Sequence, residues 1–141
     1  MVSAADGSIP LDSDPCPCRS GDDFGVCCGP RLSGATPAPT AETLMRSRYT
    51  AFAVGDTGYL LRSWHPRTRP RTLALDPEQR WLSLEVLSTE RGGPFDDTGV
   101  VAFRAHYRTA GTRGSLHESS RFARVDGRWV YVDGDIAADP R

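Results

Sequence analysis

Apolar residues between Thr40 and Val54 recur with the period of an amphipathic helix. The members that would share one side are Ala41, Leu44, Met45, Tyr49 and Phe52. Pro39 and Thr40 are typical of a helix start, and Gly55 suits a helix end. We therefore expect a helix over these residues that buries its apolar side.

A second, shorter helix is expected directly afterwards. Asp56 can cap its start, because a carboxylate accepts hydrogen bonds from the first backbone N–H groups of a helix. Its apolar face would consist of Tyr59, Leu60 and Trp64. Pro66 should end it, since a residue that precedes proline avoids helical backbone angles. Residues 65–79 contain three prolines and predict a loop.

Alternating apolar and polar positions predict four strands in the rest of the chain. Their apolar groups lie within residues 81–87, 101–107, 116–125 and 129–132. Strict alternation would place Leu84 on one face of the first strand and Trp81 on the other. The breaks are rich in glycine, and Asp126-Gly127 is the strongest hairpin signal. The order of the elements indicates an α+β fold, with helices packed on one face of a curved antiparallel sheet.

The chain divides by composition into five segments. We expect residues 1–14, which are small, acidic and turn-prone, to be a disordered leader. Residues 15–30 contain every cysteine, and residues 31–39 form a linker of Pro, Gly, Ser and Thr that should follow the surface as a loop. Residues 40–135 would form the α+β domain, and residues 136–141 a tail.

The overall composition is that of a globular protein: 38% of the 141 residues are hydrophobic and 25% are charged. The net charge of -1 provides no global attraction to nucleic acid or to a membrane surface. No apolar run approaches the roughly 20 residues of a membrane helix, and the first residues lack the pattern of a secretory signal. We therefore expect a cytoplasmic protein whose thiols stay reduced.

The four cysteines, Cys16, Cys18, Cys27 and Cys28, have the spacing C-x-C-x8-C-C. Four thiolates within thirteen residues can close a tetrahedron around Zn2+, and a fully thiolate set leaves no open position for catalysis. Disulfides conflict with the compartment, and a redox pair would need C-x-x-C beside a βαβ unit. An iron–sulfur cluster is the remaining alternative. We expect one structural zinc ion.

The segment CPCRSGDDFGVCCG resembles the SEC-C motif, a zinc knuckle found in bacterial proteins. Two features depart from that motif. Arg19 stands where glycine is usual, and the arm GDDFGV is acidic where the motif is often basic. If the basic arm normally contacts nucleic acid or an acidic partner, this copy is poorly suited to that contact.

The continuation from GPRLSGATPAPTAETLMRSRYTAFAVGDTGYLLRSWHP to HESSRFARVDGRWVYVDGD resembles the YchJ-like family of uncharacterised bacterial proteins. The resemblance covers roughly residues 15–135. It implies an SEC-C knuckle followed by a domain of the nuclear transport factor 2-like (NTF2-like) fold, a cone of helices over a bent antiparallel sheet. It implies no particular reaction.

A cone of this fold often encloses a pocket, and its candidate lining residues here are Tyr49, Trp64, His65, His117 and Tyr131. His106 and Glu118 are further candidates. His117 and Glu118 are adjacent on a strand and must face opposite ways, so they cannot form a simple dyad. Our pocket hypothesis combines Tyr49, Trp64 and His117; the alternative is that each histidine is a structural or surface residue.

The only local basic run comprises Arg62, Arg67, Arg69 and Arg71. Such a run is usually a solvated face, but beside an SEC-C knuckle it could contact RNA or an acidic protein. Trp64, Trp81, Trp129, Phe52 and Phe103 are expected in the core rather than as ligand platforms.

These observations favour a non-catalytic, zinc-binding interaction protein that presents its knuckle to a protein or ribonucleoprotein partner, while the cone packs against the knuckle or forms a homodimer. The alternative is a small-molecule-binding protein or enzyme that uses the pocket of the cone. Zinc storage or redox sensing is a third hypothesis. Direct binding to nucleic acid has weaker support, and no membrane contact is expected.

Overall fold

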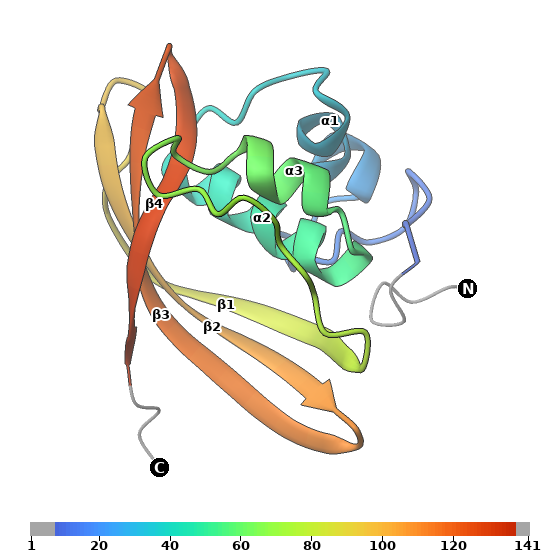
Figure 1. Cartoon of the computed structure of the whole chain (residues 1–141). Coiled ribbons are helices and arrows are strands. Elements are labelled where there is room, and N and C mark those ends of the chain that lie inside the picture. Colours follow the sequence, from blue (N-terminus) through green and yellow to red (C-terminus); the bar gives the residue numbers. More distant parts are fainter. Residues whose placement is uncertain (1–7, 138–141) are drawn as a thin grey trace.

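A four-stranded antiparallel sheet with helices over its concave face forms the body of the protein (Figure 1). The computed structural model describes residues 8–137. The strands follow each other in the order β1-β2-β3-β4, and every neighbouring pair is antiparallel. The elements are η2 (Phe24–Val26), α1 (Cys28–Ser33), α2 (Ala41–Val54), α3 (Thr57–Arg62), β1 (Gln79–Arg91), β2 (Thr98–Thr109), β3 (Thr112–Val125) and β4 (Arg128–Ala137). The predicted α+β class is confirmed.

Helix α2 is the central helix, and local sequence signals define both of its ends. The Thr40 hydroxyl accepts a hydrogen bond from the backbone N–H of Thr43, and the Thr43 hydroxyl accepts one from the backbone N–H of Thr40, which is a capping box. Gly55 ends the helix with a φ of 79°, a left-handed conformation that glycine adopts without strain. The predicted helix over residues 40–54 is therefore confirmed.

Helix α3 also begins as predicted, because the Asp56 carboxylate accepts a hydrogen bond from the backbone N–H of Tyr59. The helix ends at Arg62, whereas the sequence pattern predicted that it would continue until Pro66. The reason is a backbone pairing with β4: Tyr131 N–H donates to the carbonyl of Ser63, and His65 N–H donates to the carbonyl of Tyr131. Trp64 therefore lies beyond the helix, in a bridge to Tyr131.

The predicted turn at Asp126-Gly127 joins β3 to β4, with φ values of 53° and 79°. Two consecutive positive φ angles are the signature of the type I′ turn, whose twist matches that of a hairpin. A second tight turn at Ala110-Gly111 joins β2 to β3, where Thr109 pairs with Thr112. The hairpin of β2 and β3 extends beyond the helices (Figure 1).

The strict alternation predicted for β1 is wrong, because the strand contains a β-bulge. Trp81 pairs with Tyr107 but Ser83 pairs with His106, so Leu82 is an extra residue between them. The bulge moves Trp81 onto the same face as Leu84. There the Trp81 ring lies 5.4 Å from that of Tyr107, measured between centroids.

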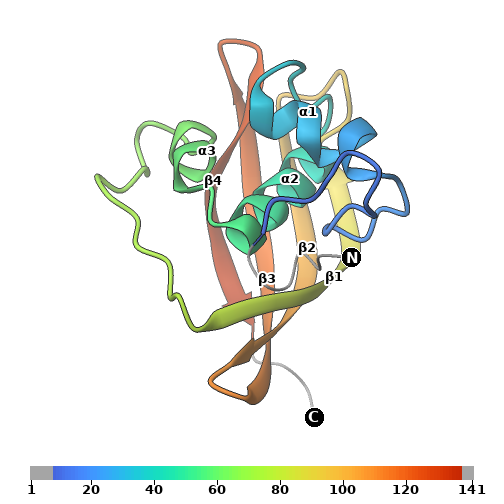
Figure 2. The ribbon, with the colours of Figure 1, turned by 90° about the vertical axis from the view of Figure 1, so that its right-hand side faces the viewer.

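Helix α2 lies against the concave face of the sheet, and α1 lies on the side of α2 away from the sheet (Figure 2). The buried cluster between these layers includes residues of both helices and of all four strands. Its most deeply buried members include Leu60, Ala51, Val101, Ala105 and Phe122. One core therefore joins the helices, the sheet and the cysteine segment, which contributes Cys16, Cys18 and Cys28.

Three predicted boundaries need correction. The expected disordered leader covers residues 1–14, of which 1–7 lie outside the described residues. Asp14 is buried, and its carboxylate accepts a hydrogen bond from the Leu11 N–H at 2.8 Å, so the end of this segment is packed. The first three residues of the predicted linker 31–39 belong to α1. Residues 136 and 137 of the predicted tail extend β4, and 138–141 are outside the described residues.

Within residues 8–137, none of the helices combines the length and the apolar character needed to cross a bilayer.

Candidate functional site

The four cysteine sulfurs form a compact set. All four Sγ atoms of Cys16, Cys18, Cys27 and Cys28 lie within 4.8 Å of one another. The Sγ atoms of Cys18 and Cys27 are 3.6 Å apart, and those of Cys27 and Cys28 are 4.0 Å apart. A tetrahedral site with metal–sulfur bonds of about 2.3 Å requires sulfurs about 3.8 Å apart. The arrangement can therefore hold one metal ion.

Two tight backbone segments bring the sulfurs together. The first cysteine pair lies in a turn closed by a hydrogen bond from the Arg19 N–H to the Cys16 carbonyl at 3.1 Å. Arg19 has a φ of 65°, which explains why glycine is usual at this position of the motif. The second pair stands where η2 meets the start of α1 at Cys28. The N–H of Cys16 donates to the Asp22 carbonyl at 2.9 Å and closes the loop between the pairs.

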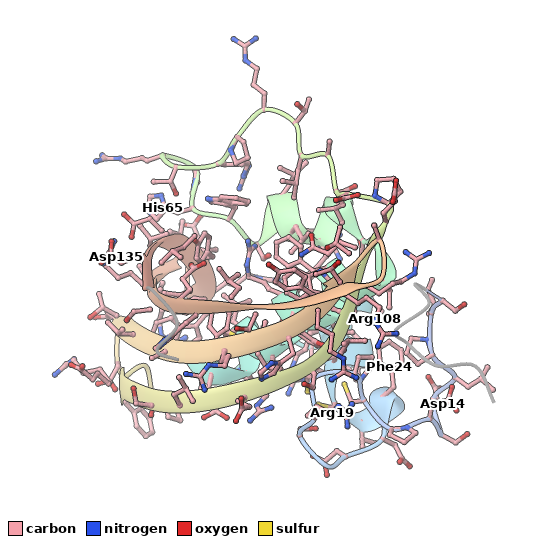
Figure 3. The ribbon with its side chains drawn as sticks, turned by 90° about the horizontal axis from the view of Figure 1, so that it is seen from below. Asp14, Arg19, Phe24, His65, Arg108 and Asp135 are labelled. Atoms are coloured by element: carbon pink, nitrogen blue, oxygen red, sulfur yellow. The ribbon has the colours of Figure 1, made fainter. Side chains whose placement is uncertain are left out.

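The knuckle, residues 15–30, is docked on the cone. Arg46 of α2 donates through Nη1 to the carbonyl of Cys18 at 2.8 Å. Arg19 donates through Nη2 to the carbonyl of Leu82 in β1 at 2.9 Å. The Sγ of Cys16 lies 3.9 Å from the Thr50 hydroxyl. Figure 3 shows the labelled Arg19 and Phe24 on the opposite side of the view from His65 and Asp135.

Hydrogen bonds within the sulfur set separate the pKa values of its thiols. Bonds from Cys16 and Cys28 lower the pKa of Cys18 far below that of an ordinary thiol. The same bonds raise the pKa of Cys28, and the bond with Cys18 raises that of Cys16; burial adds to both increases. A cation at the centre of the set would replace the shared protons, because cysteine binds metal ions as the thiolate.

A separate cavity of about 180 Å³ lies between α2 and the sheet. Most of its wall is aromatic, with Tyr49, Phe52, Trp64, Trp81, Phe103, Phe122 and Tyr131. Tyr49, Trp64 and Tyr131 were predicted to line a pocket, and the structure brings these three together. Its polar groups come from Arg48, Glu118 and Ser120.

The prediction that His117 and His65 line this pocket is wrong. Glu118 faces the cavity, and because neighbouring residues of a strand alternate, His117 faces the other side of the sheet. His65 instead stabilises a turn, where its Nδ1 accepts a hydrogen bond from the N–H of Arg67 at 3.1 Å. His106 lies on the outer face with His117, with its Nε2 2.8 Å from Glu85 Oε1.

Arg48 is a charged site residue that the sequence analysis missed. It lies in the middle of α2 and is only 5% exposed. Its Nη1 donates to the Leu60 carbonyl at 2.8 Å and to the Ser63 hydroxyl at 2.7 Å. The guanidinium stacks 5.0 Å from the Trp64 ring and 4.6 Å from the Tyr131 ring, and burial lowers its pKa to about 10. An arginine on a helix normally faces solvent, so the pattern contained no signal for it.

Glu118 is held on the opposite wall. Its Oε2 accepts hydrogen bonds from the Ser120 hydroxyl at 2.8 Å and from the Tyr131 hydroxyl at 3.0 Å. Gly134 of β4 leaves room for this carboxylate, because a Cβ there would overlap it. Burial raises the pKa of Tyr131, and the nearby Glu118 charge adds to the increase. Tyr131 therefore remains a neutral hydrogen-bond donor at neutral pH.

The four arginines of the predicted basic contact are all exposed, but they differ in their contacts. Arg62 donates to the Leu32 carbonyl and stacks on the Tyr59 ring, and Arg69 donates to the Trp64 carbonyl. Arg67 and Arg71 are exposed. Arg62 and Arg69 line a groove of about 490 Å³ together with Arg31 and Arg128.

The four-cysteine knuckle and the cone of helices on a bent sheet together define an SEC-C protein with an NTF2-like domain. Residues 13–30 match the family described as the SEC-C motif, and residues 40–134 match the family described as the middle NTF2-like domain of YchJ. The chain belongs to the YchJ-like family, as the sequence resemblance implied.

Relatives in this family are named UPF0225 proteins. The chain is 57% identical over 126 residues to one from Streptomyces coelicolor, an alignment that covers 89% of this chain and 98% of the relative. It is 52% identical over 130 residues to one from Corynebacterium efficiens, with 92% and 99% covered.

Two solved structures share the fold. The solution structure of an SEC-C motif protein from Rhodopseudomonas palustris is 34% identical, has a TM-score of 0.75, and aligns over 87% of this chain and 98% of that protein. The crystal structure of an SEC-C motif protein from Psychrobacter arcticus is 24% identical, with a TM-score of 0.71 and 94% and 88% covered. The second likeness concerns the fold alone.

Proposed function

We propose that this chain is a cytoplasmic interaction protein whose knuckle is organised by one zinc ion and presented to a protein partner. The observation that carries the proposal is the closed set of four cysteine sulfurs docked on α2. Sulfur ligands in a tetrahedral set favour zinc or an iron–sulfur cluster. These four sulfurs lie close enough together to surround a single ion, which suits zinc. A reduced thiol set also fits a cytoplasmic location.

Zinc would have a structural role in this site. Cys16, Cys18, Cys27 and Cys28 would each supply one thiolate, and bound zinc supplies a cross-link between the two halves of the knuckle. The Ser20 hydroxyl, 3.1 Å from the Cys27 sulfur, is placed to donate to that thiolate. Arg46, with its positive charge beside Cys18, would offset part of the excess negative charge.

Apolar side chains are exposed on the knuckle and on the segment just before it. Ile9, Leu11 and Val26 are 73%, 69% and 74% exposed. The two segments that hold them are joined by a hydrogen bond from the Gly25 N–H to the Asp12 carbonyl at 2.9 Å. Exposed apolar side chains gathered on a small rigid unit are typical of a protein-interaction surface.

The charges around this surface favour a protein partner over RNA. Asp12, Asp22 and Asp23 are exposed acidic residues in this part of the chain. Arg19, which precedes the acidic arm, donates its side chain to the Leu82 carbonyl. Phosphate groups would be repelled here, since nucleic-acid contacts depend on neutralisation by Lys and Arg. We infer a partner with apolar side chains surrounded by basic ones.

A comparative pull-down tests the proposal. The tagged chain, a double variant Leu11→Ser with Val26→Ser, and a control variant Phe95→Ser are used as baits in the native host lysate. Phe95 is the control because it is also an exposed apolar residue, at 99%, but lies outside the proposed surface, in the turn between β1 and β2. We expect one set of proteins to be lost from the double variant and retained by the control. Identical recoveries would contradict the proposal, and partners released by ribonuclease would replace it with an RNA contact.

A further inference from the structure

The aromatic cavity between α2 and the sheet has the composition of a small-molecule site. Its wall is mostly apolar, and its few polar groups come from Arg48, Glu118, Ser120 and Tyr131 and from the indole of Trp64. Ligand sites in proteins typically combine apolar walls with a few fixed polar groups. Its volume of about 180 Å³ is below the roughly 300–1,000 Å³ of sites for drug-sized ligands, so it suits a molecule of one or two rings.

One end of the cavity has hydrogen-bond donors without acceptors. The Nε1 of Trp64 is buried, and no described residue accepts a hydrogen bond from it. Arg48 makes both of its side-chain hydrogen bonds through Nη1, which leaves Nε and Nη2 without a hydrogen-bond partner in residues 8–137. A buried donor without an acceptor, such as the Trp64 indole N–H, costs free energy, so this end favours a ligand that supplies an acceptor.

The other polar group of the cavity is an acceptor. Both hydrogen bonds to Glu118 go to Oε2, and within the described part of the chain its Oε1 accepts none. The Glu118 carboxylate and the Arg48 guanidinium both line the cavity but bond to other groups and not to each other. Tyr131 lies between them, with its ring under Arg48 and its hydroxyl bound to Glu118. The cavity thus presents separated positive and negative groups.

We propose that this cavity binds a small, neutral, planar aromatic amide or lactam, with its carbonyl oxygen towards Arg48 and Trp64 and its N–H towards Glu118. A carboxylate would be attracted by Arg48 but repelled by Glu118. An ammonium would be attracted by Glu118 but repelled by Arg48. A neutral group with a donor beside an acceptor can accept hydrogen bonds from Arg48 and Trp64 and donate one to Glu118. The aromatic wall favours a flat ring, because rings pack edge-to-face or offset against one another. This inference is independent of the proposed role of the knuckle.

Three probes with the same ring separate the alternatives. Benzamide carries a donor and an acceptor, benzoate is an anion, and benzylammonium is a cation. Each is titrated into the ¹⁵N-labelled full-length, zinc-loaded chain, and the indole N–H signal of Trp64, assigned with Trp64→Phe, reports binding by NMR. We expect a saturable downfield shift with benzamide and binding about ten-fold weaker for the two ions, because each meets one like charge. The absence of any benzamide shift, or tighter binding of benzoate, would overturn the proposal.

A charge-removing variant tests the assignment of Glu118. Glu118→Gln keeps the size of the side chain and an acceptor oxygen but removes the negative charge. We expect benzoate to bind about ten-fold more tightly to this variant, since the repulsion is lost. Benzamide should bind about three-fold more weakly, because its N–H loses a charged acceptor. The matched control is Glu85→Gln on the outer face, which should leave all three titrations unchanged. Equal benzoate affinities in wild type and Glu118→Gln would exclude Glu118 from the site.

Arg48→Met tests the acceptor-binding end. The variant should lose the benzamide shift, although the buried Arg48 also supports the Leu60 carbonyl. If this variant does not fold, the Glu118→Gln titrations still decide the proposal, because they leave Arg48 in place. A folded Arg48→Met that binds benzamide as the wild type does would contradict the assigned orientation.

Discussion

The Nη1 atom of Arg46 lies 2.8 Å from the carbonyl oxygen of Cys18, across 28 residues of chain. The same guanidinium is oriented by Glu42, one helical turn earlier, whose Oε2 is 3.0 Å from Arg46 Nε. The central helix therefore holds the turn that carries the first pair of cysteines. Through this contact the knuckle and the cone become one folded unit.

We predict that Arg46→Met lowers the free energy of unfolding by about 1–3 kcal/mol, because it leaves the buried Cys18 carbonyl without its charged donor. Chemical denaturation measures the change, and the rate of metal transfer to a chelator should rise in parallel. Arg71→Met is the control, since Arg71 is exposed in the loop before β1. A metal-transfer rate equal to that of the wild type would show that the knuckle does not depend on this contact.

Native mass spectrometry of freshly purified, tag-free protein should find one zinc ion per chain. Its removal by a chelator should lower the free energy of unfolding by several kcal/mol, roughly the scale on which metal binding stabilises small metal domains. Cys27→Ser should bind metal poorly while the cone retains its circular dichroism. The finding of iron with inorganic sulfide, or of less than about a tenth of an equivalent of any metal, would refute the zinc assignment.

Stability at alkaline pH should depend on two buried tyrosines and one half-buried tyrosine. Burial raises the pKa of Tyr49, Tyr59 and Tyr131 above the ordinary value of 10.0. A raised folded-state pKa contributes stability that is fully present below pH 10 and is lost as the pH rises towards the folded-state value. We therefore expect unfolding to become easier above pH 10, and these phenols to ionise only with it. Phenolate absorbance and circular dichroism, recorded together, test this, and Tyr131→Phe should reduce the pH sensitivity.

Two glycine substitutions should have opposite effects. A Cβ on Gly99 would lie 2.5 Å from the Cα of Gly92, so Gly99→Ala forces the backbone of β1 and β2 apart. We expect it to destabilise the protein by about 1–3 kcal/mol through overpacking. Gly58 lies in α3, where a Cβ has ordinary contacts, so Gly58→Ala should stabilise by about 0.5–1 kcal/mol through helix propensity. Thermal unfolding measures both changes. An unfolding temperature that does not fall in Gly99→Ala, or does not rise in Gly58→Ala, would contradict the corresponding prediction.

Elements specified by neighbouring residues could be predicted from the sequence. The capping box at Thr40 and Thr43, the cap at Asp56 and the hairpin turn at Asp126-Gly127 each involve residues within three positions of one another. The cysteine set also belongs to this class, because its spacing within thirteen residues brings the sulfurs together through local turns. These signals determine the helices and the connections between strands.

The composition of the pocket could be predicted only in part. Tyr49, Trp64 and Tyr131 were chosen as aromatic residues near the expected helix and strands, and they do line the cavity. His117 was chosen for its chemistry, but the register of β3 directs Glu118 inwards instead. A shift of one residue in a strand exchanges its two faces, so the sequence pattern alone could not distinguish the two neighbours.

The sequence by itself determined the two helices, the hairpin connections, the cysteine set that can hold a metal ion and the family, because these depend on short-range geometry and on motif spacing. Only the tertiary structure decided that Trp81 joins the core across a bulge, that Arg48 is buried between two aromatic rings, and that Arg46 holds the knuckle on α2. The physical reason is that these features arise from contacts between residues distant in the chain. Their free energy depends on how the sheet and helices pack together, and no local pattern encodes it.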